Sequence, residues 1–392
     1  MIQLYLKPGK EQSVKRLHPW IFSGAIASYS GNPQEGDIVS VFSSTKEFLA
    51  LGHYQKSSIA VRILSFSQEF IHQEFWNKRI ASAFEYRKTI GLVDNLQTNC
   101  YRLVHGEGDN LPGLIIDFYN GVAVLQMHSV GMYKHMNNIV EACKTVLGER
   151  LQAVYNKSTS TLPFKAETDN VDGLVWGNVH TTQVHEYGNT FVIDWEKGQK
   201  TGFFIDQREN RKLVELYSKD KRVLNTFCYT GGFSVYALRG GAKQVVSVDS
   251  SSRAIELTNE AIELNFPLCS NHMAITEDVF DFFQTNTQKF DVIILDPPAF
   301  AKHNSALNNA LQGYKRLNMK AMEHLAPGGI LFTFSCSQVV TKEDFRKSVF
   351  AAAANCKRSV RIIQQLTQPA DHPISIFHPE GEYLKGLLLQ IE

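Results

Sequence analysis

The chain has 392 residues, 43% of them hydrophobic, which is enough for two or three domains with ordinary cores. Its formal net charge of +1 gives no overall basic field that would by itself indicate nucleic-acid binding. The six cysteines lack C-x-x-C and zinc-type spacings, and no apolar run approaches the roughly 18 residues of a membrane span, so we expect a cytoplasmic protein with reduced thiols, without metal and without membrane contact.

Residues 1–70 consist of short apolar segments separated by turn residues, a spacing that predicts a small β-barrel. Two runs stand out, HPWIFSG over 18–24 and FLALGHY over 48–54. Together they resemble the PUA domain, an RNA-binding barrel, and the resemblance implies an RNA-binding role for this domain. Without the resemblance, Trp20 and Phe22 would be assigned to the core.

Residues 71–188 have the pattern of an α+β domain. Apolar residues recur at helical spacing from Ile71 to Ile90, and Asn120-Gly121 between two apolar segments predicts a hairpin. We interpret the Gly-Glu-Gly-Asp segment over 106–109 as a structural loop, because too few carboxylates surround it for a metal or phosphate site. The other predicted elements are a helix over 131–147 and strands near 151–156 and 173–176.

The third predicted domain, residues 189–392, opens with the run KTGFFIDQR over 200–208. This polar, glycine-containing loop leads into a helix, for which Asp206 is the expected N-cap. The run resembles the element that leads into the catalytic domain of PUA-containing rRNA cytosine-5 methyltransferases, where the cofactor rests. The resemblance implies that Phe204, Gln207 and Arg208 line the cofactor pocket; ordinary packing is the alternative for each.

Residues 222–251 predict a strand, a glycine turn, a helix and a second strand. Gly231 and Gly232 allow positive φ and a close approach of the backbone to a ligand, and the following helix N-terminus offers free N–H groups. Asp249 ends the second strand, where a carboxylate can accept both hydroxyls of a ribose. A nucleoside cofactor is indicated, although the dinucleotide spacing G-x-G-x-x-G is absent. The cofactor-binding candidates here are Phe227, Tyr229, Thr230, Gly231, Gly232, Asp249 and Ser250.

A third strand near 272–275 is followed by acidic and aromatic residues. A carboxylate can accept a hydrogen bond from the exocyclic amine of adenine, and a neighbouring ring can stack on the base. We assign the carboxylate role to Asp278, with Val279 beside it in the pocket and Phe280 as support. Asp281 is the second choice and fits better as a solvated or capping residue.

The run FDVIILDPPAF over 290–300 decides which cofactor is expected. An apolar strand ends in Asp-Pro-Pro, and the two prolines make a stiff rim at the carboxyl end of the strand, where open α/β sheets bind ligands. The combination resembles the class I S-adenosylmethionine-dependent methyltransferases. The resemblance implies S-adenosylmethionine as cofactor and places Asp296 beside both the cofactor and the target.

The next predicted elements are a helix over 307–325, a turn over 326–329 and a strand over 330–334 that ends in Ser335-Cys336-Ser337. Carbon 5 of cytosine is a poor nucleophile until a thiolate adds to carbon 6, so a cytosine-5 methyltransferase needs a cysteine at the cofactor pocket and a proton donor near N3. Cys336 is the candidate for the nucleophile, and Asp296 is the candidate for the proton donor near N3. The alternative is that Cys336 is a small buried residue.

Over essentially its whole length the chain resembles the PUA-domain-containing, class I S-adenosylmethionine-dependent family of rRNA large-subunit cytosine-5 methyltransferases. The resemblance implies an α/β fold: a C-terminal Rossmann-like methyltransferase domain with a mainly parallel seven-stranded sheet, after a PUA barrel and an α+β domain. It implies 23S rRNA, or a large-subunit precursor, as the RNA partner, and leaves a homodimer open.

Two departures from that family bear on the choice of target more than on the reaction. Ala299 stands where relatives often carry lysine, and 156–159 reads Asn-Lys-Ser-Thr in place of an arginine segment with an acid. Two other functions remain as alternatives. One is methylation of a guanine or amide nitrogen, which would not need Cys336. The other is a non-catalytic RNA-binding or assembly protein, which would be expected to lose Asp249 or Asp278.

Overall fold

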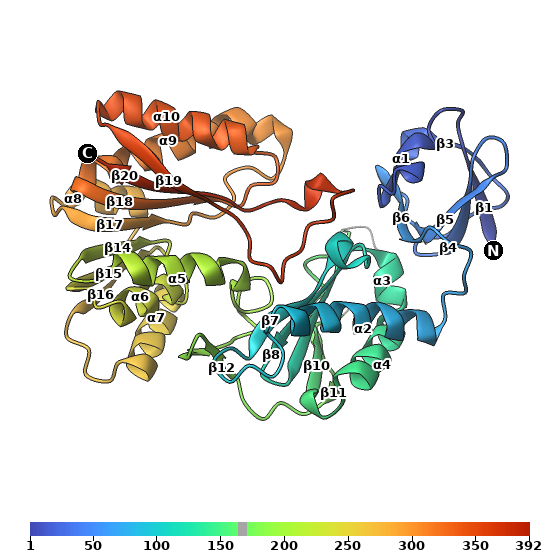
Figure 1. Cartoon of the computed structure of the whole chain (residues 1–392), viewed down its shortest axis with the longest axis horizontal. Coiled ribbons are helices and arrows are strands. Elements are labelled where there is room, and N and C mark those ends of the chain that lie inside the picture. The colour runs from blue at the N-terminus through green and yellow to red at the C-terminus, as the bar shows by residue number, and fades with distance from the viewer. Residues whose placement is uncertain (164–170) are drawn as a thin grey trace. The chain divides into compact units, whose positions relative to one another are not determined.

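The computed structural model describes residues 1–163 and 171–392, and its contacts divide the chain into two compact units (Figure 1). The predicted boundary between residues 188 and 189 coincides with the end of the first continuous segment; the division into three domains stays a prediction. Two later segments return to the first unit, which no local sequence pattern indicated. Unit 1 comprises Met1–Gly188, Val192–Ile205 and Ala370–Gly381, and unit 2 comprises Asn189–Phe191, Asp206–Pro369 and Glu382–Glu392.

The N-terminal part of unit 1 is a six-stranded sheet of order β2-β6-β5-β4-β1-β3. Its interior is aliphatic and contains Leu4, Val39 and Val41. Assigning Trp20 and Phe22 to this core is wrong: Trp20 is half-buried and Phe22 is 48% exposed, because β2 is an edge strand. The elements are β1 (Ile2–Leu6), α1 (Gln12–Lys15), β2 (Trp20–Phe22), β3 (Ile26–Tyr29), β4 (Ile38–Phe42), β5 (Phe48–Tyr54) and β6 (Ile59–Ser65).

The described residues of the next segment form a five-stranded sheet of order β11-β10-β9-β8-β7, against which α2 and α4 bury Trp76 and Ile139. The predicted hairpin joins β8 to β9, with positive φ at Asn120 (45°) and Gly121 (99°). The helix predicted over 131–147 is interrupted at His135. The elements are α2 (Gln73–Thr89), β7 (Cys100–His105), β8 (Leu114–Tyr119), β9 (Val122–Met127), α3 (Val130–Lys134), α4 (Met136–Leu147), β10 (Ala153–Asn156) and β11 (Gly173–Gly177).

The Gly-Glu-Gly-Asp loop is structural, as expected. Arg87 of α2 donates two hydrogen bonds to Asp109, at 2.5 and 2.8 Å, and Trp20 Nε1 donates to Glu107 at 2.7 Å. Both carboxylates therefore serve to hold the fold. Among residues 1–163 and 171–392, no group of three His, Cys, Asp or Glu side chains is arranged to hold a metal ion. In the same ranges every helix is too short or too polar to cross a bilayer.

Unit 2 is built on a seven-stranded sheet of order β16-β15-β14-β17-β18-β20-β19. The first five of these strands run parallel, and β20 is antiparallel to both of its neighbours. The strand order reverses at β14, the position at which such sheets bind ligands. The strands are β14 (Arg222–Thr226), β15 (Gln244–Asp249), β16 (His272–Thr276), β17 (Phe290–Leu295), β18 (Leu325–Ser335), β19 (Val360–Leu366) and β20 (Lys385–Ile391); β12 (Gln183–Glu186) and β13 (Asn189–Val192) form a separate pair.

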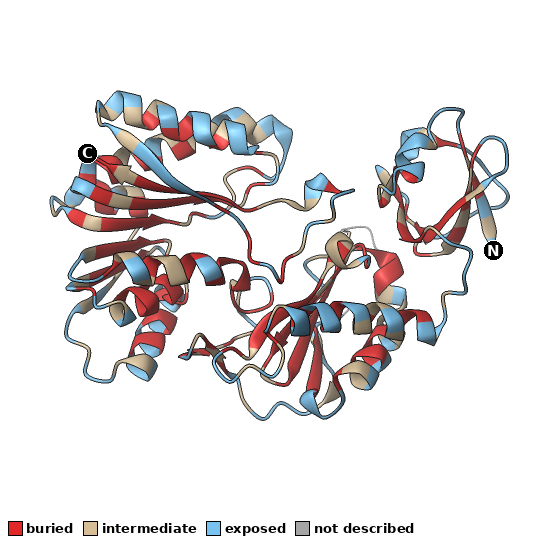
Figure 2. Ribbon diagram, in the orientation of Figure 1, coloured by how far each residue is buried: buried red, intermediate tan, exposed pale blue. Residues whose placement is uncertain are grey.

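Helices cover both faces of this sheet (Figure 1), so its central strands are buried on both sides (Figure 2). Leu224 and Ile293 face the layer of α8, α9 and α10, whereas Val223 and Val292 face α5 and α6. The alternation explains why these strands read as continuous hydrophobic runs. The helices are α5 (Arg208–Tyr217), α6 (Gly232–Arg239), α7 (Ser252–Asn265), α8 (Val279–Thr285), α9 (Leu307–His324) and α10 (Lys342–Cys356).

The turn predicted over 326–329 is part of β18, which begins at Leu325. The pairing with β17 passes from Phe290–Leu325 directly to Val292–Ile330, so the four residues form an irregularity within the strand. Gly328 keeps the positive φ expected of a turn, at 76°. The predicted bend is therefore present, but it does not end the strand, because β18 pairs with β17 both before and after it.

Candidate functional site

The carboxyl ends of the parallel strands bring three predicted residues of unit 2 to one edge of the sheet. Asp249 ends β15, Asp296 directly follows β17, and Cys336 directly follows β18. Because β17 and β18 pair in parallel, with Leu295 opposite Thr333, the segments carrying Asp296 and Cys336 leave the sheet side by side. The edge can therefore place a carboxylate and a thiol against one ligand.

The turn after β14 is held in a conformation that few sequences adopt. Phe227, Tyr229 and Gly231 have φ of 54°, 48° and 72°. Left-handed φ at non-glycine residues costs energy, and such strain is concentrated at ligand sites. Two contacts maintain the turn: Tyr229 N–H donates to Asp249 Oδ2 at 3.0 Å, and Thr258 Oγ1 donates to the Tyr229 carbonyl at 2.9 Å.

Asp249 is fixed by backbone donors on both of its oxygens. In addition to Tyr229 N–H on Oδ2, the Ser251 N–H donates to Oδ1 at 2.9 Å. Each carboxylate oxygen can accept more than one hydrogen bond, so a ribose diol still finds acceptors. Thr230, which follows Tyr229, is buried, and Ser250, which follows Asp249, is exposed. Their predicted contacts with the cofactor stay predictions. The carboxylate is thus aimed before any ligand binds.

Gly231 and Gly232 make room for close packing at the start of α6. A Cβ on Gly231 would lie 2.8 Å from Thr258 Cγ2, and one on Gly232 would lie 3.0 Å from Arg211 Cδ. Gly231 also needs its positive φ, whereas Gly232 begins the helix. Both glycines are therefore required by packing within the protein, and their contacts with a cofactor stay predictions.

Asp278 has a structural partner that the sequence interpretation omitted. It is the N-cap of α8, and its Oδ1 accepts from Phe280 N–H at 2.8 Å and Asp281 N–H at 3.4 Å. Val279 is buried among the residues that α8 packs on the sheet. A capping carboxylate retains acceptor capacity, so the adenine contact of Asp278 stays a prediction.

The residues of the 200–208 run fall in both units. Phe204 belongs to unit 1, where Lys200 Nζ lies 4.3 Å from the centre of its ring. Gln207 and Arg208 are buried in unit 2 at the start of α5, and Gln207 Oε1 accepts from Asn210 at 2.6 Å. Their cofactor contacts stay predictions. Asp206 is not the N-cap, which is Gln207; Asp206 instead accepts from Tyr383 Oη at 2.7 Å.

Cys336 is presented by two serines that anchor the strand end. Ser335 Oγ donates to Tyr314 Oη at 2.9 Å, and Ser337 Oγ lies 3.0 Å from the same hydroxyl. Both serines are fully buried, while Cys336 between them is half-buried, as expected where side chains alternate along an extended segment. Its Sγ donates a long hydrogen bond, 3.9 Å, to the Pro297 carbonyl of the Asp-Pro-Pro rim.

The other cysteine near the site has a different environment. Cys228 lies within the strained turn, where burial raises the pKa of its thiol to about 12, and its Sγ lies 3.5 Å from Thr258 Oγ1. Burial likewise raises the pKa of Cys143 to about 12. Such thiols stay protonated and unreactive at neutral pH.

Two residues at this edge were missed from the sequence. Tyr314 holds both serines, but its spacing from Ala310 and Leu317 is simply that of a buried helical face. Lys385 begins β20 and donates to the Ser337 carbonyl at 2.6 Å, 48 positions away in sequence. Only the insertion of β20 beside β18 reveals that contact.

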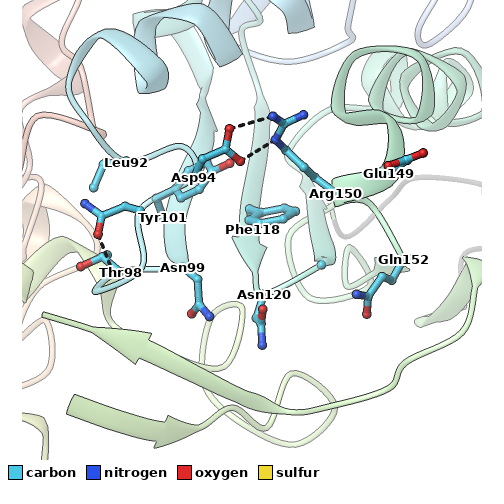
Figure 3. A pocket seen from close by; sticks show the side chains of 12 residues that line it. Leu92, Asp94, Thr98, Asn99, Tyr101, Phe118, Asn120, Glu149, Arg150 and Gln152 are labelled. Carbon is cyan, nitrogen blue, oxygen red and sulfur yellow. Dashed lines mark hydrogen bonds and ion pairs between the residues drawn. The ribbon is translucent and has the colours of Figure 1, made fainter. Parts of the chain in front are cut away.

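A separate pocket of about 250 Å³ lies in unit 1, and none of the predicted site residues lines it (Figure 3). Its wall includes the exposed Asp94–Arg150 pair, joined by two hydrogen bonds of 2.7 Å. Besides that pair, its lining residues include the ionisable side chains of Tyr101 and Glu149. The chemistry of this chain therefore points to the sheet edge of unit 2.

We expect Asp249→Ala to weaken S-adenosylmethionine binding by about 10- to 100-fold. The change leaves ribose hydroxyls unpaired and removes the acceptor of Tyr229 N–H, at a cost of about 1–3 kcal/mol. Calorimetric titration checks this. The matched control is Asp291→Ala, whose carboxylate accepts from Arg222 N–H at 2.8 Å at the opposite edge of the same sheet and should leave affinity unchanged. Equal affinities in both variants would contradict the assignment.

Comparison with known proteins gives full-length matches. A family model described as S-adenosylmethionine-dependent methyltransferase matches residues 101–389, and a PUA-like domain model matches residues 4–66. The chain is 40% identical to the ribosomal RNA large subunit methyltransferase I of Aeromonas hydrophila, over 99% of this chain and 98% of that one. It is 41% identical to the protein of the same name from Pseudoalteromonas atlantica, over 98% of each.

Among solved structures, SMU.776 in complex with SAH is similar over the full length of both chains. The TM-score is 0.87 and the sequence identity is 25%. Both compact units of the present chain are therefore covered by the match.

Proposed function

We propose the following function for this chain, which belongs to the family of S-adenosylmethionine-dependent methyltransferases. Membership confirms the predicted cofactor and the predicted PUA-plus-methyltransferase fold, and the SAH bound to SMU.776 agrees with the cofactor. We infer that the chain methylates ribosomal RNA of the large subunit, as the names of its relatives state for them, and that its target is carbon 5 of a cytosine in 23S rRNA. The half-buried Cys336 thiol against the Asp-Pro-Pro rim carries the cytosine assignment.

The reaction requires activation of the base. Addition of the Cys336 thiolate to carbon 6 makes an enamine whose carbon 5 attacks the methyl group. When bound, S-adenosylmethionine would supply that group as an electrophilic sulfonium methyl and would leave as S-adenosylhomocysteine, whose sulfur takes the electron pair of the broken S–CH3 bond. A base then removes the proton from carbon 5, and the electron pair of the broken C–H bond expels the thiolate from carbon 6. The thiolate is regenerated and no redox partner is needed.

The residues of the sheet edge divide this work. Asp249 and the strained turn orient the donor, and Asp296 is assigned the hydrogen bond near N3 that stabilises charge during addition. Pro297 and Pro298 stiffen the rim next to the thiol, since each fixes φ and lacks a backbone donor. Ser335 and Ser337 hold the strand end so that Cys336 faces the rim.

The RNA contact is assigned to residues 4–66 because they match a PUA-like domain model; the net charge of +1 gives no overall basic field that would attract RNA by itself. The contacts of residues 156–159, where the chain departs from the family pattern, support a structural role for them. Lys157 is buried and its Nζ donates to the carbonyls of Trp195 and Gly198, and Thr159 donates to Asp172. This lysine therefore fastens the loop before residue 200 and is not free to contact phosphate.

The test is mass mapping of large-subunit rRNA from a strain lacking this protein. We expect loss of one 5-methylcytosine, restored in vitro by purified protein with S-adenosylmethionine. Purified protein whose N-terminal truncation starts near residue 72 should retain cofactor affinity and lose most RNA affinity. Loss of a methylated guanine in the deletion strain would establish a nitrogen target, and an unchanged modification pattern would favour an assembly role.

A further inference from the structure

A buried lysine adjoins the segment that carries Cys336. Lys385 is the first residue of β20 and is only 4% exposed. It lies opposite Ser335 in the antiparallel pairing of β20 with β18. Lysine is almost never buried without a specific partner, because removing an ammonium group from water is costly. Its presence at this position calls for a compensating interaction.

The ammonium group is hydrogen-bonded to the backbone just after the end of β18 and just before the start of β20. Its Nζ donates to the Ser337 carbonyl at 2.6 Å and to the Tyr383 carbonyl at 2.7 Å. These bonds use two of its three N–H groups, and no third acceptor is found among residues 1–163 and 171–392. The first bond fixes the residue that directly follows Cys336. The lysine therefore determines where the thiol-bearing segment lies.

The two side chains also interact electrostatically. Burial lowers the pKa of Lys385 to about 8, while negative charge on Cys336 and Glu382 raises it and the exposed Lys342 lowers it further. Lys342 is itself paired with Glu382, so the charges of those two groups largely offset each other. A Coulomb interaction is reciprocal. A Cys336 thiolate that stabilises the charged form of Lys385 is itself stabilised by that charge to the same extent.

We propose that Lys385 is a positioning residue that favours ionisation of Cys336 and holds its segment beside the Asp-Pro-Pro rim, an inference that rests on the proposed nucleophilic role of Cys336. Ionisation breaks the S–H bond, leaves the electron pair on sulfur and releases the proton to solvent. Lys385 retains its three N–H bonds throughout. A neighbouring cation is the usual means by which proteins make a cysteine reactive near neutral pH.

The test measures thiol reactivity without methyl transfer. The rate of iodoacetamide modification of Cys336 is followed by peptide mass spectrometry between pH 5.5 and 9.5. In the wild-type protein the midpoint should lie about one unit or more below the ordinary cysteine value of about 8.5. Lys385→Gln, which keeps a hydrogen-bond donor and removes the charge, should raise the midpoint by about one unit and slow modification at pH 7 about tenfold.

Lys385→Arg should restore most of the wild-type profile, and Lys347→Met, which removes an exposed lysine of α10, should leave it unchanged. A wild-type midpoint at or above about 8.5 overturns the proposal whether or not the variants fold. So does an unshifted midpoint in folded Lys385→Gln protein. Neither result bears on the nucleophile itself, which is tested by methylation with Cys336→Ala.

Discussion

Cys336→Ala should abolish methylation of the RNA substrate while S-adenosylmethionine binds with wild-type affinity. Without the thiolate, carbon 5 of cytosine is not activated, so we expect a loss of at least about 10⁴-fold in turnover. Cofactor affinity should persist because the Asp249 contacts lie on a different strand. Single-turnover transfer of a labelled methyl group and calorimetry measure the two quantities separately.

The matched control is Cys269→Ser, another partly exposed cysteine, whose Sγ donates only to its neighbour Asn271 at 3.2 Å. This variant should methylate at the wild-type rate. RNA containing 5-fluorocytosine should trap a covalent adduct with the wild-type protein and not with Cys336→Ala, since fluorine prevents the final proton abstraction. Asp296→Asn should slow the reaction. Near-wild-type turnover by Cys336→Ala would refute the nucleophile and favour a nitrogen target.

Arg87→Met should destabilise unit 1 by about 3–5 kcal/mol. The Arg87 guanidinium is fully buried; it binds Asp109 with two hydrogen bonds and also donates to the carbonyls of Arg102 and Asp371, each at 2.7 Å. Methionine fills similar space but removes the Arg87 bonds to both carbonyls and leaves the buried Asp109 carboxylate only the His105 N–H as donor. The Asp371 bond also secures the Ala370–Gly381 segment within its unit.

Urea unfolding followed by tryptophan fluorescence isolates this effect, because all four tryptophans, Trp20, Trp76, Trp176 and Trp195, belong to unit 1. Arg150→Met is the matched control. Arg150 forms the same two-bond pair with Asp94, but the side chains are 46% and 60% exposed, so we expect a loss below about 1 kcal/mol. Similar losses in the two variants would mean that burial of the Arg87 pair does not govern stability.

Much of the architecture could be predicted because it depends on local patterns. Continuous apolar runs predicted the central strands, and Asn120-Gly121 predicted the hairpin between β8 and β9. Predictions that depended on which residues lie nearby in the folded chain were wrong. Trp20 and Phe22 are apolar, yet β2 is an edge strand and leaves Phe22 exposed; Asp206 resembles a cap, yet its partner is Tyr383, 177 positions away.

The sequence alone determined that Asp249, Asp296 and Cys336 lie at one edge of a sheet. Each ends or follows an apolar strand, and the carboxyl ends of parallel strands necessarily meet at the same edge. Only the tertiary structure decided what surrounds them. Lys385 reaches the Cys336 segment because β20 inserts antiparallel beside β18, and Arg87 meets Asp371 because the chain returns to unit 1. Such contacts join residues 48 and 284 positions apart, and no local periodicity encodes a pairing over that distance.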